Sequence, residues 1–202
     1  MTGTWNLARR FQKNKLLRHV VFSSTISVYG EQNGILKETD VCLPDNVYAV
    51  SKYASERILE QFCGAQKVGL SILRYGSVYG PDMNAETVIS RFIGMAKEGK
   101  DLEVFGDGGR YQDFVHLNDV VNANLAACEK QAEGIFNVGC GKKTTMKELA
   151  EIILKQYGKA RQKIVLSGKP EMRPSQLMSL QKSESELGYR PSLRLDDGIK
   201  LN

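Results

Sequence analysis

Short runs of apolar and β-branched residues alternate along this chain with stretches of helical periodicity. The runs that predict strands are Val20–Ser23, Gly69–Arg74, Leu102–Phe105, Asp113–His116, Ile135–Val138 and Ile164–Leu166. The stretches that predict helices are residues 1–17, 48–66, 88–98, 120–129, 144–157 and 182–187. Strands that alternate with helices are typical of the α/β class, in which helices cover a largely parallel sheet.

Polar residues mark the starts of two of these helices. Asn118 or Asp119 is placed to cap the helix that follows it. Thr144 or Thr145, together with Glu148, has the spacing of a capping box, in which the two residues satisfy each other's free backbone N–H groups.

The composition limits the kind of protein this can be. The chain has 202 residues, a formal net charge of +5 and 42% hydrophobic residues, which is enough for a packed core in one domain or slightly more. No apolar run reaches the ~18 residues of a membrane span, and the N-terminus lacks a signal-peptide pattern. The positive charge is spread along the chain, which indicates a solvated surface and not a nucleic-acid-binding patch, and it also suits an anionic diphosphate ligand.

Cysteine and histidine usage indicates neither disulfides nor a metal site. Cys42, Cys63, Cys128 and Cys140 are scattered without C-x-x-C spacing, and the chain has only two histidines. Reduced cysteines and a cytoplasmic location are therefore expected.

Tyr48 and Lys52 are the first candidates for chemistry. They are four residues apart in a predicted helix, so their side chains lie on one face, and Glu56 on the same helix is placed to pair with neighbouring turns. An ammonium group at that distance favours the phenolate and lowers the pKa of a tyrosine from about 10 toward the range of an acid/base catalyst. The same spacing also occurs between surface residues without a role, so the pair needs support from the rest of the chain.

That support comes from the strands before and after the helix. The first strand ends in Ser23-Ser24-Thr25, and the strand after the helix runs into Tyr75. The polar loop Glu31–Pro44 is long for a compact domain, which fits a loop beside a site. In open α/β sheets, ligands bind beyond the carboxyl ends of the strands, which is where these side chains are expected.

Taken in order, the motifs of this chain resemble those of the extended short-chain dehydrogenase/reductases, specifically the NAD-dependent nucleotide-sugar epimerase/dehydratase group. The matching segments keep the order and spacing of that family from about residue 1 to 200. They are Ser23-Ser24-Thr25, Val28-Tyr29-Gly30, Tyr48 with Lys52, Leu73-Arg74-Tyr75, Val78-Tyr79-Gly80-Pro81, Phe105-Gly106-Asp107-Gly108, Asp113-Phe114-Val115-His116 with Asp119-Val120, Phe136-Asn137-Val138-Gly139 and Leu187-Gly188-Tyr189-Arg190-Pro191. Each motif is weak alone, whereas the set is specific.

The resemblance implies an α/β fold with a partial Rossmann-like, doubly wound parallel sheet. Residues 1–80, with later strands contributing, would be the C-terminal portion of an NAD-binding domain, and residues 81–202 would be a small substrate-binding α/β region. The glycine-rich turn that receives the pyrophosphate of NAD is not found. The densest glycine cluster, Gly106–Gly109, follows a strand but precedes no helix, so NAD is expected to bind weakly or not at all.

The resemblance also implies the reaction, which is transient oxidation of a sugar hydroxyl by NAD. Tyr48 would take the hydroxyl proton and later return it, and Lys52 would hold the phenolate and bond the nicotinamide ribose. Thr25 would hydrogen-bond the same sugar oxygen, with Ser24 and Ser27 as alternatives. A hydroxyl and a phenolate that converge on one oxygen form a proton relay.

The remaining residues implied by the resemblance fall into two sets. The residues expected at the cofactor are Ser23, Ser24, Tyr48, Lys52, Tyr75 and Val78. The residues expected at the substrate are Thr25, Ser77, Arg110 and Arg173, with the two arginines holding the diphosphate.

The chain also departs from the family pattern. Gln112 stands where the family places an arginine, and Ser77 replaces an asparagine. Arg173-Pro174 is followed by Ser175-Gln176 in place of Gly-Asp, so the pocket is expected to be altered. Ile26-Ser27 stand where the dehydratases of this family carry an acidic pair, and because Ile26 cannot do acid/base work, 4-epimerisation or keto reduction is favoured over dehydration.

Three hypotheses fit this sequence. The chain is an N-terminally truncated epimerase, an inactive remnant that binds a nucleotide sugar or a protein partner, or one half of a split epimerase. In each case Val20–Ser23 would lie at an unpaired sheet edge. A homo-oligomer or a companion N-terminal chain is therefore expected, together with a nucleotide-diphosphate sugar and neither a nucleic acid nor a membrane.

Overall fold

The structure, a computed structural model, describes residues 1–201. Its main sheet contains β1 (His19–Thr25), β3 (Gly69–Tyr75) and β7 (Gly134–Val138) in the order β1-β3-β7, all parallel. β1 and β3 pair along their whole length, from His19 opposite Gly69 to Thr25 opposite Tyr75. Their carboxyl ends therefore lie side by side, and the expected α/β class is confirmed.

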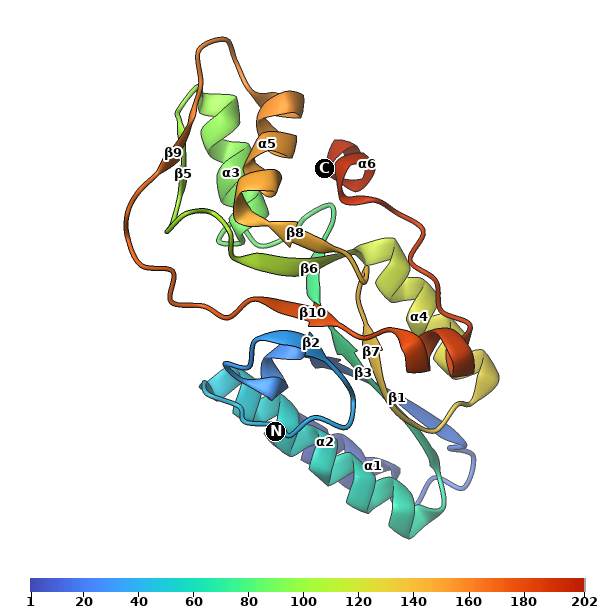
Figure 1. The fold of residues 1–202 in the computed structure, drawn as a ribbon. Coiled ribbons are helices and arrows are strands. Elements are labelled where there is room, and N and C mark those ends of the chain that lie inside the picture. Colours follow the sequence, from blue (N-terminus) through green and yellow to red (C-terminus); the bar gives the residue numbers. More distant parts are fainter. Residues whose placement is uncertain (202) are drawn as a thin grey trace.

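Helices cover both faces of this sheet. In Figure 1 the three strands run between α2 (Val47–Gln66) on one side and α4 (Leu117–Lys130) on the other, and both helices contact β1 and β3. Helix α1 (Thr2–Phe11) packs against α2. β1 has β3 as its only strand neighbour among residues 1–201, so the expected edge position of this strand is confirmed.

Three smaller sheets accompany the main sheet within residues 1–201. They are β4 (Ser77–Tyr79), β6 (Tyr111–His116) and β8 (Lys143–Thr145) in that order, then β2 (Gly34–Leu36) with β10 (Gln176–Met178), and β5 (Leu102–Val104) with β9 (Ile164–Leu166). Only the β6–β8 pairing is antiparallel. The loop expected at residues 31–44 thus contains β2, which pairs with a strand more than a hundred residues later.

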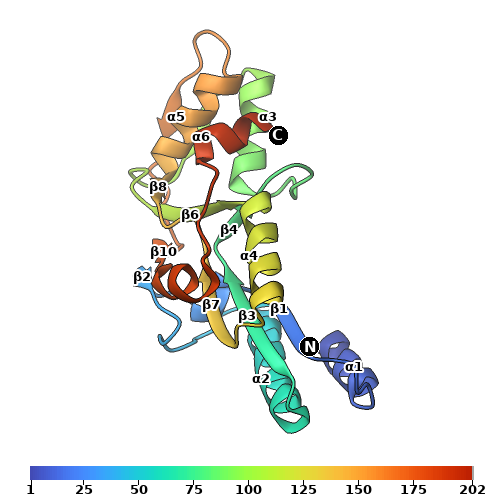
Figure 2. The same ribbon diagram turned by 90° about the vertical axis from the view of Figure 1, so that its right-hand side faces the viewer.

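The far end of the molecule is helical. Figures 1 and 2 show α3 (Val88–Glu98), α5 (Met146–Tyr157) and the short α6 (Leu195–Gly198) together there. Buried apolar side chains of α3 and α5, such as Phe92 and Leu149, form one core cluster, and a second lies under α4 against the main sheet. The remaining turns are the 3₁₀ segments Ile26–Tyr29 and Ile199–Leu201 and the π segment Ser183–Leu187.

One of the two predicted helix caps is present and the other is wrong. Thr145 and Glu148 form the capping box at the start of α5. At α4 the cap is His116, whose Nδ1 accepts the N–H of Asn118 at 3.1 Å. Asp119 is turned away instead, and its carboxylate accepts the N–H of Ser192 at 2.9 Å. A histidine cap was missed because this side chain is seldom found in that role.

Within residues 1–201 no group of His, Cys, Asp and Glu side chains is arranged to hold a metal ion. The four cysteines are free thiols, and the cytoplasmic location expected from them stays a prediction. In the same part of the chain, no helix combines the length and apolar character needed to cross a bilayer.

Candidate functional site

Tyr48 and Lys52 lie on α2 beside the carboxyl end of β1. Asn46 caps this helix, with its Oδ1 accepting the N–H of Ala49 at 3.0 Å, so Tyr48 falls in the first turn. Tyr48 is 55% exposed. Lys52 Nζ donates a hydrogen bond of 2.7 Å to the carbonyl of Ser23, which ties the helix to the strand end.

The Lys52 ammonium lies near two aromatic rings. Its Nζ is 5.2 Å from the ring centroid of Phe22 and 6.0 Å from that of Tyr48. Partial burial lowers the pKa of Lys52. The four-residue spacing therefore brings the ammonium near the tyrosine as expected, and the stabilised phenolate stays a prediction.

Strand β1 ends at Thr25, whose side chain folds onto the next turn. Thr25 Oγ1 accepts the N–H of Ser27 at 3.2 Å and lies 3.3 Å from the hydroxyl of Ser27. Ser24 points to the opposite face of the strand, where its hydroxyl donates a 2.5 Å hydrogen bond to Glu56. Of the three hydroxyl residues considered for the relay, Thr25 and Ser27 thus form a pair, and Ser24 belongs to a buried network.

That network is centred on a buried ion pair between Glu56 and Arg74. Arg74 donates to both carboxylate oxygens, at 2.7 and 3.1 Å, and both side chains are almost fully buried. The expectation that Glu56 pairs with its own helix is wrong, because this residue lies one turn beyond Lys52 on the face that α2 turns to the sheet. The pair, together with Ser24, fixes α2 against β1 and β3.

On the other face of the sheet, Tyr75 joins the two strands to α4. Its hydroxyl is 2.9 Å from the hydroxyl of Ser23, and Asn124 of α4 donates a 2.8 Å hydrogen bond to it. Burial raises the pKa of Tyr75, so this phenol stays protonated while Tyr48 is exposed. The acid/base role expected of Tyr48 stays a prediction.

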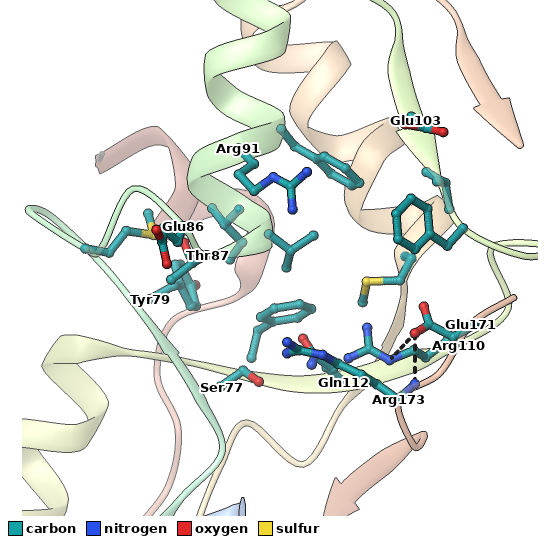
Figure 3. Close-up of a pocket in the computed structure, with 18 of the residues that line it drawn as sticks. Ser77, Tyr79, Glu86, Thr87, Arg91, Glu103, Arg110, Gln112, Glu171 and Arg173 are labelled. Atoms are coloured by element: carbon teal, nitrogen blue, oxygen red, sulfur yellow. Dashed lines mark hydrogen bonds and ion pairs between the residues drawn. The ribbon is translucent and has the colours of Figure 1, made fainter. Parts of the chain in front are cut away.

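A cavity of ≈ 430 Å³ lies beyond the main sheet, between α3, β4, β5 and β6 (Figure 3). Apolar side chains supply part of its wall, namely Val88, Ile89, Phe92, Val104, Phe105, Phe114 and Met146. The polar lining includes Ser77, Thr87, Arg91, Arg110, Gln112 and Arg173, with Glu86, Glu103 and Glu171. Apolar walls with a few converging charges are typical of a small-molecule site.

The two predicted arginines meet in this cavity. The Arg110 side chain is only 9% exposed, and its Nε is 3.6 Å from a carboxylate oxygen of Glu171. Arg173 is exposed, and its backbone N–H donates a 3.1 Å hydrogen bond to the same carboxylate. Burial lowers the pKa of Arg110, and the charge of Glu171 opposes this shift.

The structure thus places the predicted residues in two adjoining groups. Four of the cofactor residues, Ser23, Tyr48, Lys52 and Tyr75, gather with Thr25 at the ends of β1 and β3. Ser24 lies in the buried network with Glu56 instead, and Val78, expected at the cofactor, lines the cavity with Ser77. Gly76 links the groups, and a Cβ there would come within 2.8 Å of the carbonyl of Asp113. Glycine is needed because the chain passes so close to β6.

Three functional candidates were missed in the sequence. Asn124 and Glu171 make their contacts 49 and 61 residues away, to Tyr75 and Arg110, so no local pattern points to them. Arg91 lies on α3 and reaches the cavity, which only the three-dimensional position of this helix reveals.

Comparison with known proteins gives one family over most of the chain. The sequence model of the NAD dependent epimerase/dehydratase family matches residues 1–139. A putative UDP-glucose 4-epimerase of Methanocaldococcus jannaschii is 34% identical over 98% of this chain and 66% of its own length. A UDP-glucuronate 4-epimerase of Thermodesulfobacterium geofontis is 27% identical over 99% of this chain and 62% of its own. The chain therefore spans less than two thirds of the length of these relatives.

Solved structures agree with this result. UDP-glucuronic acid 4-epimerase from Bacillus cereus, in complex with UDP-glucuronic acid and NAD, superposes with a TM-score of 0.88 at 29% identity, covering 99% of this chain and 64% of that one. UDP-glucose 4-epimerase from Thermotoga maritima, with UDP-glucose, gives a TM-score of 0.86 at 29% identity, covering 100% and 67%. The expected fold class is confirmed by both.

Proposed function

Because the chain belongs to the NAD dependent epimerase/dehydratase family, we propose that it takes part in the transient oxidation of a hydroxyl on a nucleotide-diphosphate sugar. The observation that carries this proposal is the arrangement at the end of β1, where Lys52 holds the strand end and Tyr48 stands exposed beside it. NAD, when bound, supplies the hydride acceptor and donor. Tyr48 takes the hydroxyl proton and returns it, with Thr25 hydrogen-bonded to the same oxygen.

The residues present fit the nicotinamide half of the cofactor. Lys52 uses one of its three N–H groups on Ser23, so two remain for ribose hydroxyls. The Tyr48 hydroxyl has no hydrogen-bond partner within residues 1–201 and is free to meet a sugar oxygen. Ser23 and Tyr75 supply further hydroxyls at the same strand ends.

The cavity suits the nucleotide part of the substrate. Arg110 and Arg173 supply two guanidinium groups, which bind phosphate in a two-pronged geometry. Phe105 and the neighbouring apolar wall offer a surface for a base, and Ser77 adds a hydroxyl. We favour 4-epimerisation or keto reduction over dehydration, since Ile26 has no acid/base group to remove water.

Residues 1–201 contain no glycine-rich turn for the pyrophosphate of NAD, and we propose that a segment outside these residues completes the site. The free edge of β1 is the place for it, because parallel strand addition there would extend the sheet beside Ser23 and Thr25. A companion chain would supply a strand, a glycine-rich turn and a helix, whereas a second copy of this chain would cover the edge of β1 without supplying the turn.

The test is calorimetric titration of the purified chain with NAD and with UDP, followed by an assay on a UDP-sugar with NAD. We expect UDP to bind and NAD to bind tightly only when the edge of β1 is completed. Tyr48→Phe should then abolish turnover while UDP binding is unchanged. An active Tyr48→Phe variant would rule out the proposed relay.

A second candidate function, binding of a nucleotide sugar without turnover, is favoured because the cavity is formed entirely by one stretch of the chain. All of its lining side chains come from residues 77–173, so it does not depend on the edge of β1. A protein that binds a nucleotide sugar without turning it over would keep UDP affinity and show no NAD affinity under any condition. The same titrations separate the two functions.

A further inference from the structure

A carboxylate occupies the part of the cavity where the two arginines meet. Figure 3 shows the Glu171 carboxylate beside Arg110, with dashed lines that join it to Arg110 and to Arg173. One Glu171 oxygen is 3.6 Å from Nε of Arg110 and accepts the backbone N–H of Arg173 at 3.1 Å. The Arg110 guanidinium and the backbone N–H of Arg173 therefore already face an anion that belongs to the chain.

The contact between Glu171 and Arg110 is an ion pair without a hydrogen bond. At 3.6 Å the two atoms attract each other, but they are too far apart for a hydrogen bond. Arg110 Nε is fully buried and has no hydrogen-bond partner within residues 1–201. Arg173 adds like charge nearby. Arg110 thus keeps an unused donor that a better-placed acceptor would satisfy.

The backbone holds Glu171 at this place, but its side chain has a way out. Glu171 belongs to the segment between β9 and β10, which is fastened to the turn after β5 where Gly106 N–H donates to the carbonyl of Lys169 at 2.8 Å. The Glu171 side chain is 23% exposed, against 9% for Arg110. The carboxylate can therefore rotate toward solvent while Arg110 stays in the wall.

We propose that Glu171 is a stand-in anion, which neutralises Arg110 in the ligand-free protein and is displaced when a diphosphate binds. This inference rests on the proposed function, because it takes the cavity as the diphosphate subsite. A phosphate oxygen and a carboxylate repel each other, and they compete for one guanidinium. Glu171 therefore lowers affinity for every anion and selects those with enough charge to displace it, so a diphosphate is favoured over a monophosphate or a neutral sugar.

The test compares UDP binding by calorimetry to the wild-type chain, Glu171→Gln and Glu98→Gln. The amide keeps the size of the side chain and removes its charge. We expect Glu171→Gln to bind UDP roughly three- to tenfold more tightly, with a smaller preference for UDP over UMP. Glu98 also forms an ion pair, with Lys100 at 2.6 Å, but does not line the cavity, so Glu98→Gln is the matched control and should bind UDP as the wild type does.

A double variant checks that the gain comes from Arg110. In the Arg110→Gln background, Glu171→Gln should bring little further change, because the guanidinium for which the two anions compete is gone. Thermal unfolding of each variant shows whether the fold is intact.

The possible results distinguish the displacement of Glu171 from the presence of a diphosphate subsite. Equal UDP affinity in the wild type and Glu171→Gln overturns the inference and leaves the nucleotide site standing. Weaker binding by Glu171→Gln also overturns it, because the carboxylate would then orient Arg110. If neither protein binds UDP, the proposed diphosphate subsite is wrong and the inference falls with it.

Discussion

At the scale of single residues, the Glu56 carboxylate joins one helix to two strands. It accepts the hydroxyl of Ser24 on β1 and both guanidinium contacts of Arg74 on β3. Because Lys52 lies one turn earlier on the same helix, this buried contact also fixes the position of Tyr48 and Lys52 relative to the end of β1.

Removing one member of this pair should be costly. Glu56→Gln leaves the Arg74 charge buried without a counter-charge, and we expect the free energy of unfolding to fall by about 3–5 kcal/mol. Urea denaturation gives the measurement. The exposed pair of Arg57 and Glu60 offers a control, since Arg57→Met should cost about 1 kcal/mol or less. A Glu56→Gln variant as stable as the control would contradict the assigned role.

The buried carboxyl group of Asp113 should make the free energy of unfolding depend on pH. Its buried carboxylate accepts the N–H groups of Cys140, Gly141 and Met178, yet burial raises its pKa from 3.8 to about 6. The folded state therefore holds this proton more tightly than the unfolded chain, so the contribution of Asp113 is lost as pH rises from about 4 to about 6.

Asp113→Asn isolates that contribution, because the other titrating groups are common to both proteins. The free energy of unfolding of the wild type, minus that of Asp113→Asn, should decrease between pH 4 and pH 7, as followed by urea denaturation at several pH values. A difference that grows over this range would show that the backbone donors outweigh burial.

The sequence revealed residues whose partners are local and missed those whose partners are distant. Tyr48 and Lys52 were found because a helix turn alone sets their relation. The role of Glu56 was misjudged, since the sequence shows neither which helix face is buried nor that Arg74 lies opposite. Glu171 gave no local signal, because its contact with Arg110 depends on how the segment after β9 crosses the cavity.

At the scale of elements, length decided what was predictable. The long helices α2 and α3 were located nearly to the residue, because an apolar face repeats over several turns. Three-residue strands are too short for an alternating pattern, so β5 and β9 were predicted only from their runs of apolar residues, and β2, β4, β8 and β10 were missed. Their pairing is set by contacts such as β2 with β10, which join the two ends of the chain.

The capping box at α5 is a feature of this scale that can be measured. Thr145→Ala removes the acceptor for the Glu148 N–H, and we expect a loss of about 1 kcal/mol in the free energy of unfolding. Thr145→Ser keeps the hydroxyl and should differ little from the wild type. Equal losses for the two variants would mean that the methyl group, and not the cap, matters.

At the scale of the whole molecule, the open side of β1 is the main unpaired feature. Nearby elements carry exposed apolar side chains, including Trp5 and Leu7 on α1 and Val50 on α2. A free strand edge with apolar neighbours favours association with another polypeptide.

We therefore predict that the purified chain self-associates or binds a companion chain. Sedimentation velocity over a range of concentrations should show species heavier than the 22.5 kDa monomer, or a shift when the companion is added. A monodisperse, well-folded monomer that does not bind a chain carrying the glycine-rich turn would refute this prediction.

The short connection between the two groups of site residues has a consequence for what the molecule can accept. Tyr75 faces the strand ends, Ser77 faces the cavity, and Gly76 alone separates them, a stretch of at most roughly 7 Å. A ligand that fills the cavity and also reaches Tyr48 must match that fixed span of backbone. For the proposed nucleotide-sugar substrate, the span would determine which ring position lies opposite Tyr48, whereas it would depend less on the identity of the sugar.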